Sequence, residues 1–156
     1  MMGYLNDPDK TAECLSKDKW LKSGDIAYYD DDGFLFISDR LKELIKVRGY
    51  QVAPAELESL LLTHPDILDA AVIPVPDEYS GELPRAYIVL ESNCSDNDET
   101  QMAESIQKWI KEKVSSYKQL KGGVKFIEQI PKSASGKILR RLLVEVSKDE
   151  LTSNSK

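Results

Sequence analysis

The sequence has 156 residues and a formal net charge of −6 at pH 7, with 41% hydrophobic and 31% charged residues. This length fits one domain, or one domain and a piece of another, and the hydrophobic content suffices for a compact core. The acidic balance argues against nucleic-acid or anionic-membrane binding, and no apolar run reaches the length of a membrane span. Two distant cysteines, no signal peptide and no peroxisomal signal at the C-terminus favour a cytoplasmic protein without a dedicated metal site.

The first forty residues predict a short helix followed by a β-hairpin. Residues 9–15 are compatible with a helix, although this stretch is polar and weakly patterned. Residues 20–29 and 34–37 are two β-rich runs on either side of Asp32-Gly33, a dipeptide typical of hairpin turns. We therefore expect a hairpin to span residues 20–37.

A dense charged cluster follows the hairpin, with four cations in nine residues. They are Arg40, Lys42, Lys46 and Arg48, and a tight turn is predicted at Gly49-Tyr50. Such a cluster suits a loop that meets an anionic ligand or a partner domain. A solvated, salt-bridged hairpin is an equally good interpretation, because charge runs are usually surface.

The remaining sequence predicts a small α+β domain in which helices pack against a short sheet. Pro54 marks a helix start, and His64-Pro65 stops that helix. Further along, the expected elements alternate in type. They are an edge strand or strand end at 67–76, a loop at 77–84, a strand at 85–90, an acidic linker at 93–99, a helix at 99–117, a strand at 124–130, a loop at 131–137 and a helix at 138–147.

Three polar residues are candidates for chemistry, and each has a simpler structural interpretation. Lys137 ends Lys-Ser-Ala-Ser-Gly-Lys, whose small residues leave room for a phosphate, but the spacing is not that of a P-loop and a surface lysine is more common. Asp25 follows Ser-Gly and could bind sugar hydroxyls or simply form a turn. His64 is the only histidine and is best read as a helix cap, so hydrolase chemistry is not favoured.

Three stretches together resemble the adenylate-forming enzyme superfamily. They are residues 20–25, residues 33–58 and residues 131–137. The closest resemblance is to 4-coumarate:CoA ligases, acyl-CoA synthetases and beetle luciferases, and it extends over nearly the whole chain. It implies that residues 1–40 are a remnant of the large AMP-binding domain, that 41–150 form the mobile C-terminal domain, and that 151–156 are a frayed tail. Ser23 departs mildly from the family, where threonine is usual.

The resemblance also implies a two-step reaction and a role for particular residues. These enzymes use ATP, with Mg²⁺ on its phosphates, to activate a carboxylic acid as an acyl-adenylate, which then passes its acyl group to coenzyme A. By motif position, Lys137 would serve adenylation and Lys46 thioester formation, while Lys42 would be the hinge between the two arrangements. The implied ligand contacts are Asp25 and Arg40 for the AMP ribose, Gln51 for the second arrangement, and Arg48, Gly49 and Tyr50 for the approach of pantetheine.

Complete members of this family run to several hundred residues, so we expect the chain to be part of a longer enzyme. Met1-Met2-Gly3-Tyr4 resembles an internal family stretch, and the large N-terminal domain would have to act in cis or in trans. We expect the chain alone to be inactive. The alternative is a non-catalytic accessory module that binds a partner through its exposed hairpin. A luciferase-type oxidase is a third interpretation.

Overall fold

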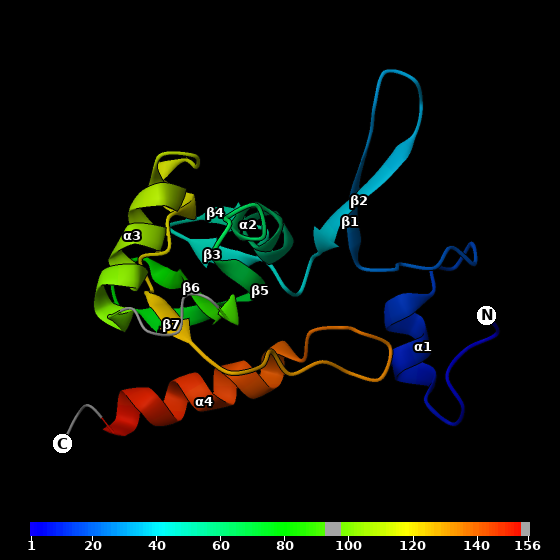
Figure 1. The fold of residues 1–156 in the computed structure, drawn as a ribbon. Coiled ribbons are helices and arrows are strands. Elements are labelled where there is room, and N and C mark those ends of the chain that lie inside the picture. The colour runs from blue at the N-terminus through cyan, green and yellow to red at the C-terminus, as the bar shows by residue number, and fades with distance from the viewer. Residues whose placement is uncertain (93–97, 154–156) are drawn as a thin grey trace. The chain divides into compact units, whose positions relative to one another are not determined.

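The computed structural model describes residues 1–92 and 98–153, and the chain forms two compact units. The first unit is Met1–Lys42 and the second is Glu43–Lys156. Figure 1 shows the elements of both units. Within the described residues, no helix is both long and apolar enough to cross a membrane.

The first unit contains helix α1 (Pro8–Cys14) and the hairpin of β1 (Asp25–Tyr29) and β2 (Leu35–Arg40) (Figure 1). The Asp7 carboxylate accepts a hydrogen bond from the Lys10 amide and caps α1. At the hairpin turn, the Asp30 carboxylate accepts a 2.8 Å bond from the Phe34 amide. The predicted hairpin is confirmed, but its bounds differ: β1 begins at Asp25 rather than at residue 20, and β2 ends at Arg40 rather than at residue 37.

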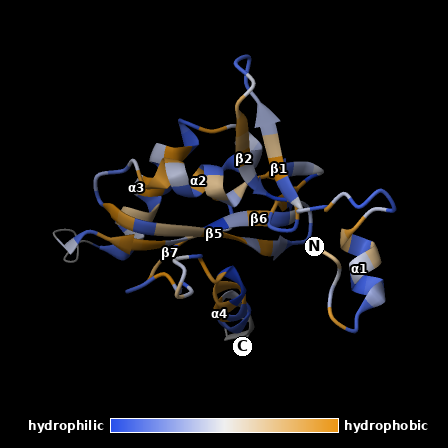
Figure 2. Cartoon of the chain, turned by 90° about the vertical axis from the view of Figure 1, so that its right-hand side faces the viewer, coloured by the Kyte–Doolittle hydropathy of each residue, from blue (hydrophilic) through white to orange (hydrophobic). Residues whose placement is uncertain are grey.

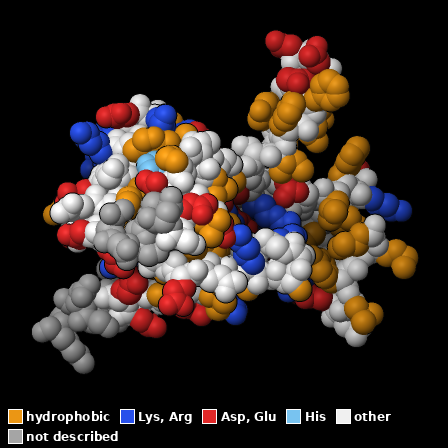
Figure 3. All heavy atoms as spheres, viewed as in Figure 1, with side chains coloured by type: hydrophobic (Ala, Val, Ile, Leu, Met, Phe, Trp, Pro, Cys, Tyr) orange, Lys and Arg blue, Asp and Glu red, His pale blue; other side chains and the backbone are white. Residues whose placement is uncertain are grey.

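The hairpin carries exposed apolar side chains. Tyr28 and Phe36 stack with ring centroids 5.3 Å apart, on neighbouring strands. Hydrophobic residues occur along both strands (Figure 2), and their side chains gather on the surface of the hairpin (Figure 3). The large apolar residues of this surface, between 44% and 71% exposed, are Tyr28, Tyr29, Phe34, Leu35, Phe36 and Ile37.

The second unit is a five-stranded sheet with helices on both faces. Its strands have the order β4-β3-β6-β5, with β7 parallel to β6 and the other pairs antiparallel. The elements are β3 (Ile45–Val47), β4 (Tyr50–Val52), α2 (Pro54–Leu61), β5 (Ile67–Asp77), β6 (Gly81–Leu90), α3 (Glu99–Lys111), the 3₁₀ turn η2 (Ser116–Lys118), β7 (Val124–Phe126) and α4 (Arg140–Ser153). This is the predicted α+β architecture.

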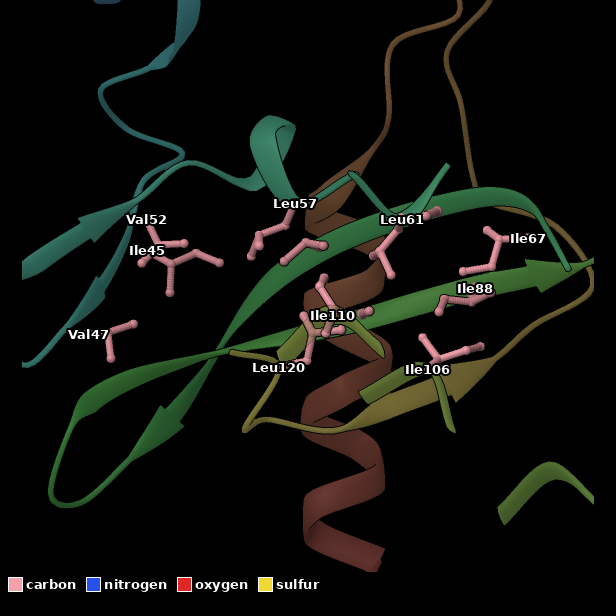
Figure 4. Packing of buried hydrophobic residues seen from close by; sticks show 13 residues of the cluster. Ile45, Val47, Val52, Leu57, Leu61, Ile67, Ile88, Ile106, Ile110 and Leu120 are labelled. Atoms are coloured by element: carbon pink, nitrogen blue, oxygen red, sulfur yellow. The ribbon is translucent and has the colours of Figure 1, made fainter. Parts of the chain in front are cut away.

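Alternation along the long strands divides the core between the two faces of the sheet. Val72 and Ile88 point to the face covered by α2 and α3, and their cluster is drawn in Figure 4. Ile73 and Tyr87, their neighbours in β5 and β6, point to the opposite face, where Leu143 of α4 covers them. Residues on both faces of β5 and β6 are therefore buried.

Several predicted boundaries in the second unit are wrong. The strand expected at 85–90 begins at Gly81, because β5 and β6 stay paired down to Asp77, so the loop expected at 77–84 is only a short turn. The helix expected to reach residue 117 ends at Lys111. The strand expected at 124–130 is shorter, because β7 ends at Phe126. Helix α4 starts two residues later than expected, at Arg140, and continues to Ser153.

Of the two positions predicted for residues 67–76, the edge strand is the one found, because within residues 1–92 and 98–153 β5 pairs only with β6. Pro74 and Pro76 are tolerated there, since an edge strand does not need every amide for the sheet. Parts of two predicted segments lie outside the described residues. They are residues 93–97 of the acidic linker expected at 93–99, and residues 154–156 of the tail expected at 151–156.

Candidate functional site

The site residues predicted in the first unit, Asp25 and Arg40, face each other across the hairpin. They are register partners at the open end of β1 and β2, and Arg40 Nε lies 3.4 Å from Asp25 Oδ1. The Arg40 side chain is 61% exposed, so its remaining N–H groups are open to a ligand. The structure thus brings together two residues that are fifteen positions apart in the sequence.

Lys46 and Gln51 are also brought together, as register partners on β3 and β4. Ile45 and Val47, on either side of Lys46, are buried, so the lysine lies on the other, exposed side of the strand. The Lys46 amide donates a 2.8 Å hydrogen bond to the Glu82 carboxylate, which ties the backbone of β3 to the start of β6. This short hairpin presents an amine and an amide together at the surface.

The turn between β3 and β4 consists of Arg48 and Gly49, both with positive φ, of +49° and +84°. Positive φ at both central positions is the pattern of a type I′ hairpin turn, and the second position suits glycine. The predicted turn is therefore present one residue earlier, and Tyr50 is already part of β4. The charged cluster thus includes a β3–β4 hairpin whose turn carries Arg48.

A second turn holds Arg48 in place. The Asp77 carboxylate accepts hydrogen bonds from the amides of Tyr79 and Ser80. Hydrogen bonding from Ser80 is the main reason that the pKa of Asp77 lies below its usual value. Ser80 in turn accepts from the Arg48 amide at 2.8 Å and from Arg48 Nε at 3.2 Å. The guanidinium is oriented by a turn 32 residues away in the sequence.

A hollow of about 190 Å³ lies beside this turn in the second unit. Its wall includes a stacked aromatic pair, because the rings of Tyr50 and Tyr117 are 4.6 Å apart between centroids and nearly parallel at 15°. Cationic, hydroxyl and apolar groups share the lining. The lining residues are Val47, Arg48, Tyr50, Ser80, Leu83, Ser116, Tyr117 and Lys121.

Lys137 lies on an exposed loop that is braced by its own hydrogen bonds. The Ser133 amide donates to the Lys137 carbonyl at 2.8 Å, and the Leu139 amide donates to the Pro131 carbonyl at 2.8 Å. Gly136, with φ of +80°, makes the turn, and a Cβ atom there would meet no other atom within 4 Å. Within the described residues, the Lys137 ammonium has no carboxylate partner. The loop therefore offers an available cation above small side chains.

Immediately after this loop, the first residue of α4 joins three segments. Arg140 donates through Nη1 to the Glu43 carboxylate and through Nη2 to both Glu58 oxygens, at 2.9 and 2.7 Å. Glu58 also accepts from the Val72 amide at 2.8 Å, and it is 7% exposed. Sequence reasoning missed this cluster, as it missed Tyr117, because the partners are distant in sequence and lack a local motif.

Not all of the predicted site residues are brought together by described contacts. Asp25 and Arg40 belong to the first unit, as does Lys42, whereas Lys46 and Lys137 belong to the second. No described hydrogen bond or ion pair joins Lys46 to Lys137, which come from β3 and from the loop before α4. Among the described residues, no group of three or more His, Cys, Asp or Glu side chains is arranged to hold a metal ion.

Known proteins resemble this chain over most or all of its length. The Arabidopsis thaliana peroxisomal OPC-8:0-CoA ligase 1 is 49% identical over all 156 residues, which correspond to 27% of that protein. A 4-coumarate–CoA ligase 1 from Glycine max is 55% identical over 90% of the chain and 46% of its own length. A luciferin 4-monooxygenase from Photuris pensylvanica is 50% identical over 92% of the chain and 25% of its own length.

A solved structure agrees with the fold. The ATP-bound RpMatB-BxBclM chimera B1 matches with a TM-score of 0.86 and 30% identity, over 94% of this chain and 28% of that one. The chain thus spans between about a quarter and a half of the length of these proteins. Residues 56–137, just over half of the chain, match the family described as AMP-binding enzyme C-terminal domain. The chain belongs to this family of C-terminal domains of adenylate-forming enzymes.

Proposed function

We propose that the chain is the C-terminal part of an ATP-dependent carboxylate–CoA ligase. Its second unit would be the mobile domain, and Lys42, directly before that unit, would be the hinge. Two of the three relatives described above are CoA ligases by name. The observation that carries the proposal is the braced loop that holds Lys137 exposed and without a carboxylate partner among the described residues.

In the first half-reaction, a carboxylate oxygen attacks the α-phosphorus of ATP, and pyrophosphate leaves. Negative charge gathers on the attacking carboxylate and on the phosphate during this step. An ammonium group held in place stabilises such charge better than a mobile one, because it needs no reorganisation as the reaction proceeds. The hydrogen bonds within residues 131–139 restrict the loop in this way, and Lys137 would supply the charge.

In the second half-reaction, the sulfur of coenzyme A attacks the acyl carbonyl, and AMP leaves. Lys46 and Gln51 lie together on the exposed side of the β3–β4 hairpin and would serve this step. The hollow beside Arg48 and Tyr50 offers cations, hydroxyls and stacked rings, a mixture that fits a long ligand with phosphates at one end. Rotation of the unit would exchange Lys137 for Lys46 at one pocket.

The hairpin pair fits the sugar of ATP. A carboxylate accepts hydrogen bonds from ribose hydroxyls, and a guanidinium donates to ring or hydroxyl oxygens, so the pair offers both kinds of partner. Asp25 and Arg40 already lie within reach of each other, which lowers the cost of ordering them around a ligand. Magnesium would be held by the ATP phosphates rather than by a protein cluster.

The two half-reactions can be measured separately on the native-length protein that contains this chain. Pyrophosphate exchange into ATP, with a panel of carboxylic acids that includes 4-coumarate, reports the first step. Conversion of a synthetic acyl-adenylate and coenzyme A to thioester reports the second. We expect Lys137→Ala to lower the first rate by roughly 10²- to 10³-fold and to spare the second, with Lys46→Ala doing the reverse.

Lys111→Ala, an exposed position on α3, is the control and should leave both rates within about twofold. Equal losses in both half-reactions for Lys137→Ala would contradict the division of labour. The 156-residue chain by itself should exchange no pyrophosphate, because it spans about a quarter of the length of most of these relatives. Exchange by the chain alone would overturn that part of the proposal.

A second candidate function is an accessory module that acts by binding a partner. The exposed apolar surface of the β1–β2 hairpin favours it, since contiguous apolar patches of this kind mark interaction sites. An immunoblot of cell extract discriminates between the two functions. A band several times larger than 17.6 kDa supports the ligase, whereas a 17.6 kDa species that copurifies with a separate large AMP-binding domain supports the module.

A further inference from the structure

One arginine in the second unit serves two carboxylates at once. The Arg140 guanidinium uses Nη1 for Glu43 and Nη2 for Glu58, and Nε is buried without a hydrogen-bond partner among the described residues. The Arg140 side chain is 20% exposed, and that of Glu58 is 10% exposed. Ion pairs in such surroundings are costly to desolvate, so their retention needs a reason beyond stability.

The next residue shows what an ordinary surface arginine does. Arg141 is 85% exposed and lies 3.7 Å from Glu145, one helical turn further along α4. Pairs of this kind contribute only a few tenths of a kcal/mol. Arg140 is therefore largely buried and joins three segments, whereas Arg141 is exposed and has a partner only within α4 in the described ion pairs. Arg141 is thus a matched control for Arg140.

Arg140 connects two segments of the second unit that both matter for the proposed reaction. Glu43 is the first residue of the second unit and directly follows Lys42, the proposed hinge. Arg140 itself directly follows Leu139, whose amide closes the Lys137 loop on the carbonyl of Pro131. A single guanidinium therefore links the start of the unit to the base of the loop, across 97 positions of the sequence.

The two ends of the Lys137 loop, residues 131–139, are anchored by different contacts. Its N-terminal, incoming side follows buried Ile130, and Lys132 on that side pairs with Asp69 of β5 at 2.5 Å. The outgoing side leads into α4, where Arg140 provides the ion pairs nearest to the loop. Lys137 is hydrogen-bonded to Ser133 of the incoming side and lies three residues before Arg140 on the outgoing side. The ion pairs of Arg140 therefore hold one of the two sides that fix Lys137.

We propose that Arg140 is a positioning residue for Lys137, and that it makes the base of the lysine loop and the start of the second unit move as one body. The inference rests on the proposed adenylation role of Lys137. Lys46 does not depend on this link, because β3 is held by its pairing with β4 and by the Glu82 carboxylate. Loss of the link should therefore harm one half-reaction and spare the other.

The test compares Arg140→Lys with Arg141→Lys in the native-length protein. A lysine cannot reproduce the fork by which arginine reaches two carboxylates. We expect Arg140→Lys to lower the turnover number for pyrophosphate exchange by about tenfold or more, since misplacement of a reacting group by about 1 Å can cost 10²-fold. The KM for ATP and the thioester-forming rate should change less than twofold, and Arg141→Lys should match the parent in all three.

Glu43→Gln keeps the buried pair between Arg140 and Glu58 and replaces the charged acceptor at the start of the unit by a neutral amide oxygen. It weakens only that link and remains informative if Arg140→Lys folds poorly. We expect it to lower pyrophosphate exchange by about threefold or more, with an unchanged melting temperature. Equal losses in both half-reactions, or unchanged exchange in Arg140→Lys and Glu43→Gln, would overturn the proposal.

Hydrogen–deuterium exchange separates this inference from the proposed function. Amides in residues 131–139 should exchange about tenfold faster in Arg140→Lys than in Arg141→Lys, while amides of α3 should be unchanged. If the parent protein activates no acid but the loop loosens as expected, the link is supported and the proposed function fails. If the parent is active and the loop exchanges equally in both variants, the link is wrong and the proposed function stands.

Discussion

Asp25 and Arg40 are register partners across the β1–β2 hairpin, with Arg40 Nε 3.4 Å from Asp25 Oδ1. The Arg40 side chain is 61% exposed, and exposed ion pairs contribute only about 0–1 kcal/mol to stability. The ion pair between Asp25 and Arg40 therefore adds little to the stability of the fold. The proposed contact with the ribose of ATP would give the pair a role that its stability does not.

The first prediction concerns this pair and the ribose of ATP. If the Asp25 carboxylate accepts hydrogen bonds from the sugar, Asp25→Ala should raise the KM for ATP by roughly ten- to hundredfold, as expected for bonds to a charged group. The variant should also stop distinguishing ATP from 3′-deoxy-ATP in the pyrophosphate exchange assay. Asp31→Ala, in the exposed hairpin turn, is the control. Retained discrimination in Asp25→Ala would exclude the sugar contact.

The second prediction concerns the core between the sheet and its helices. Leu61 of α2 is fully buried, whereas its neighbour Leu62 is 49% exposed. Leu61→Ala should lower the free energy of unfolding by about 2–5 kcal/mol, because it leaves a cavity, while Leu62→Ala should change it by about 0.5 kcal/mol or less. Urea unfolding followed by circular dichroism measures both. Similar losses for the two variants would contradict the packing.

The third prediction concerns Tyr87, whose hydroxyl is buried without a hydrogen-bond partner among the described residues. Burial, assisted by the Glu150 charge, raises the pKa of Tyr87 above its usual value of 10.0. Above pH 10 the unfolded chain releases this proton before the folded one, so stability falls as the pH rises. Tyr87→Phe should lose less stability than the parent between pH 9 and pH 11.

At pH 7, Tyr87→Phe should be as stable as the parent or more so, because the change removes a buried donor that has no partner. Tyr79→Phe is the control, since Tyr79 is 84% exposed. Thermal unfolding across this pH range gives the answer. A large loss of stability at pH 7 would mean that the Tyr87 hydroxyl is bonded in the folded protein.

The fourth prediction concerns the stack of Tyr50 on Tyr117 beside the 190 Å³ hollow. Tyr50→Ala removes a ring that lines the hollow, and a ring contact with a ligand is worth about 0.5–1.5 kcal/mol. It should therefore lower kcat/KM for coenzyme A by about two- to tenfold in the thioester assay. Tyr50→Phe should keep most of the rate. Tyr79→Ala, on a neighbouring turn, serves as the reference. An equal effect of Tyr50→Ala on pyrophosphate exchange would argue against a role in thiol approach.

Much of the local structure could be predicted because it rests on neighbouring residues. The Asp32-Gly33 turn, the proline at the start of α2 and the prolines of β5 all act within a few positions of themselves. The family could be predicted as well, because three motifs keep their order and separation along the chain. Element ends were less predictable: β6 starts at Gly81 because its partner strand, not its own propensity, continues the pairing.

The amino-acid sequence by itself determined the α+β class, the hairpin, the family and the identity of the candidate site residues. Only the tertiary structure decided which distant residues meet. Arg140 reaches Glu58 across 82 positions, and Tyr50 stacks on Tyr117 across 67 positions. The physical reason is that backbone propensities and turn chemistry act over a few residues, whereas side-chain partners are chosen by the packing of helices against a sheet.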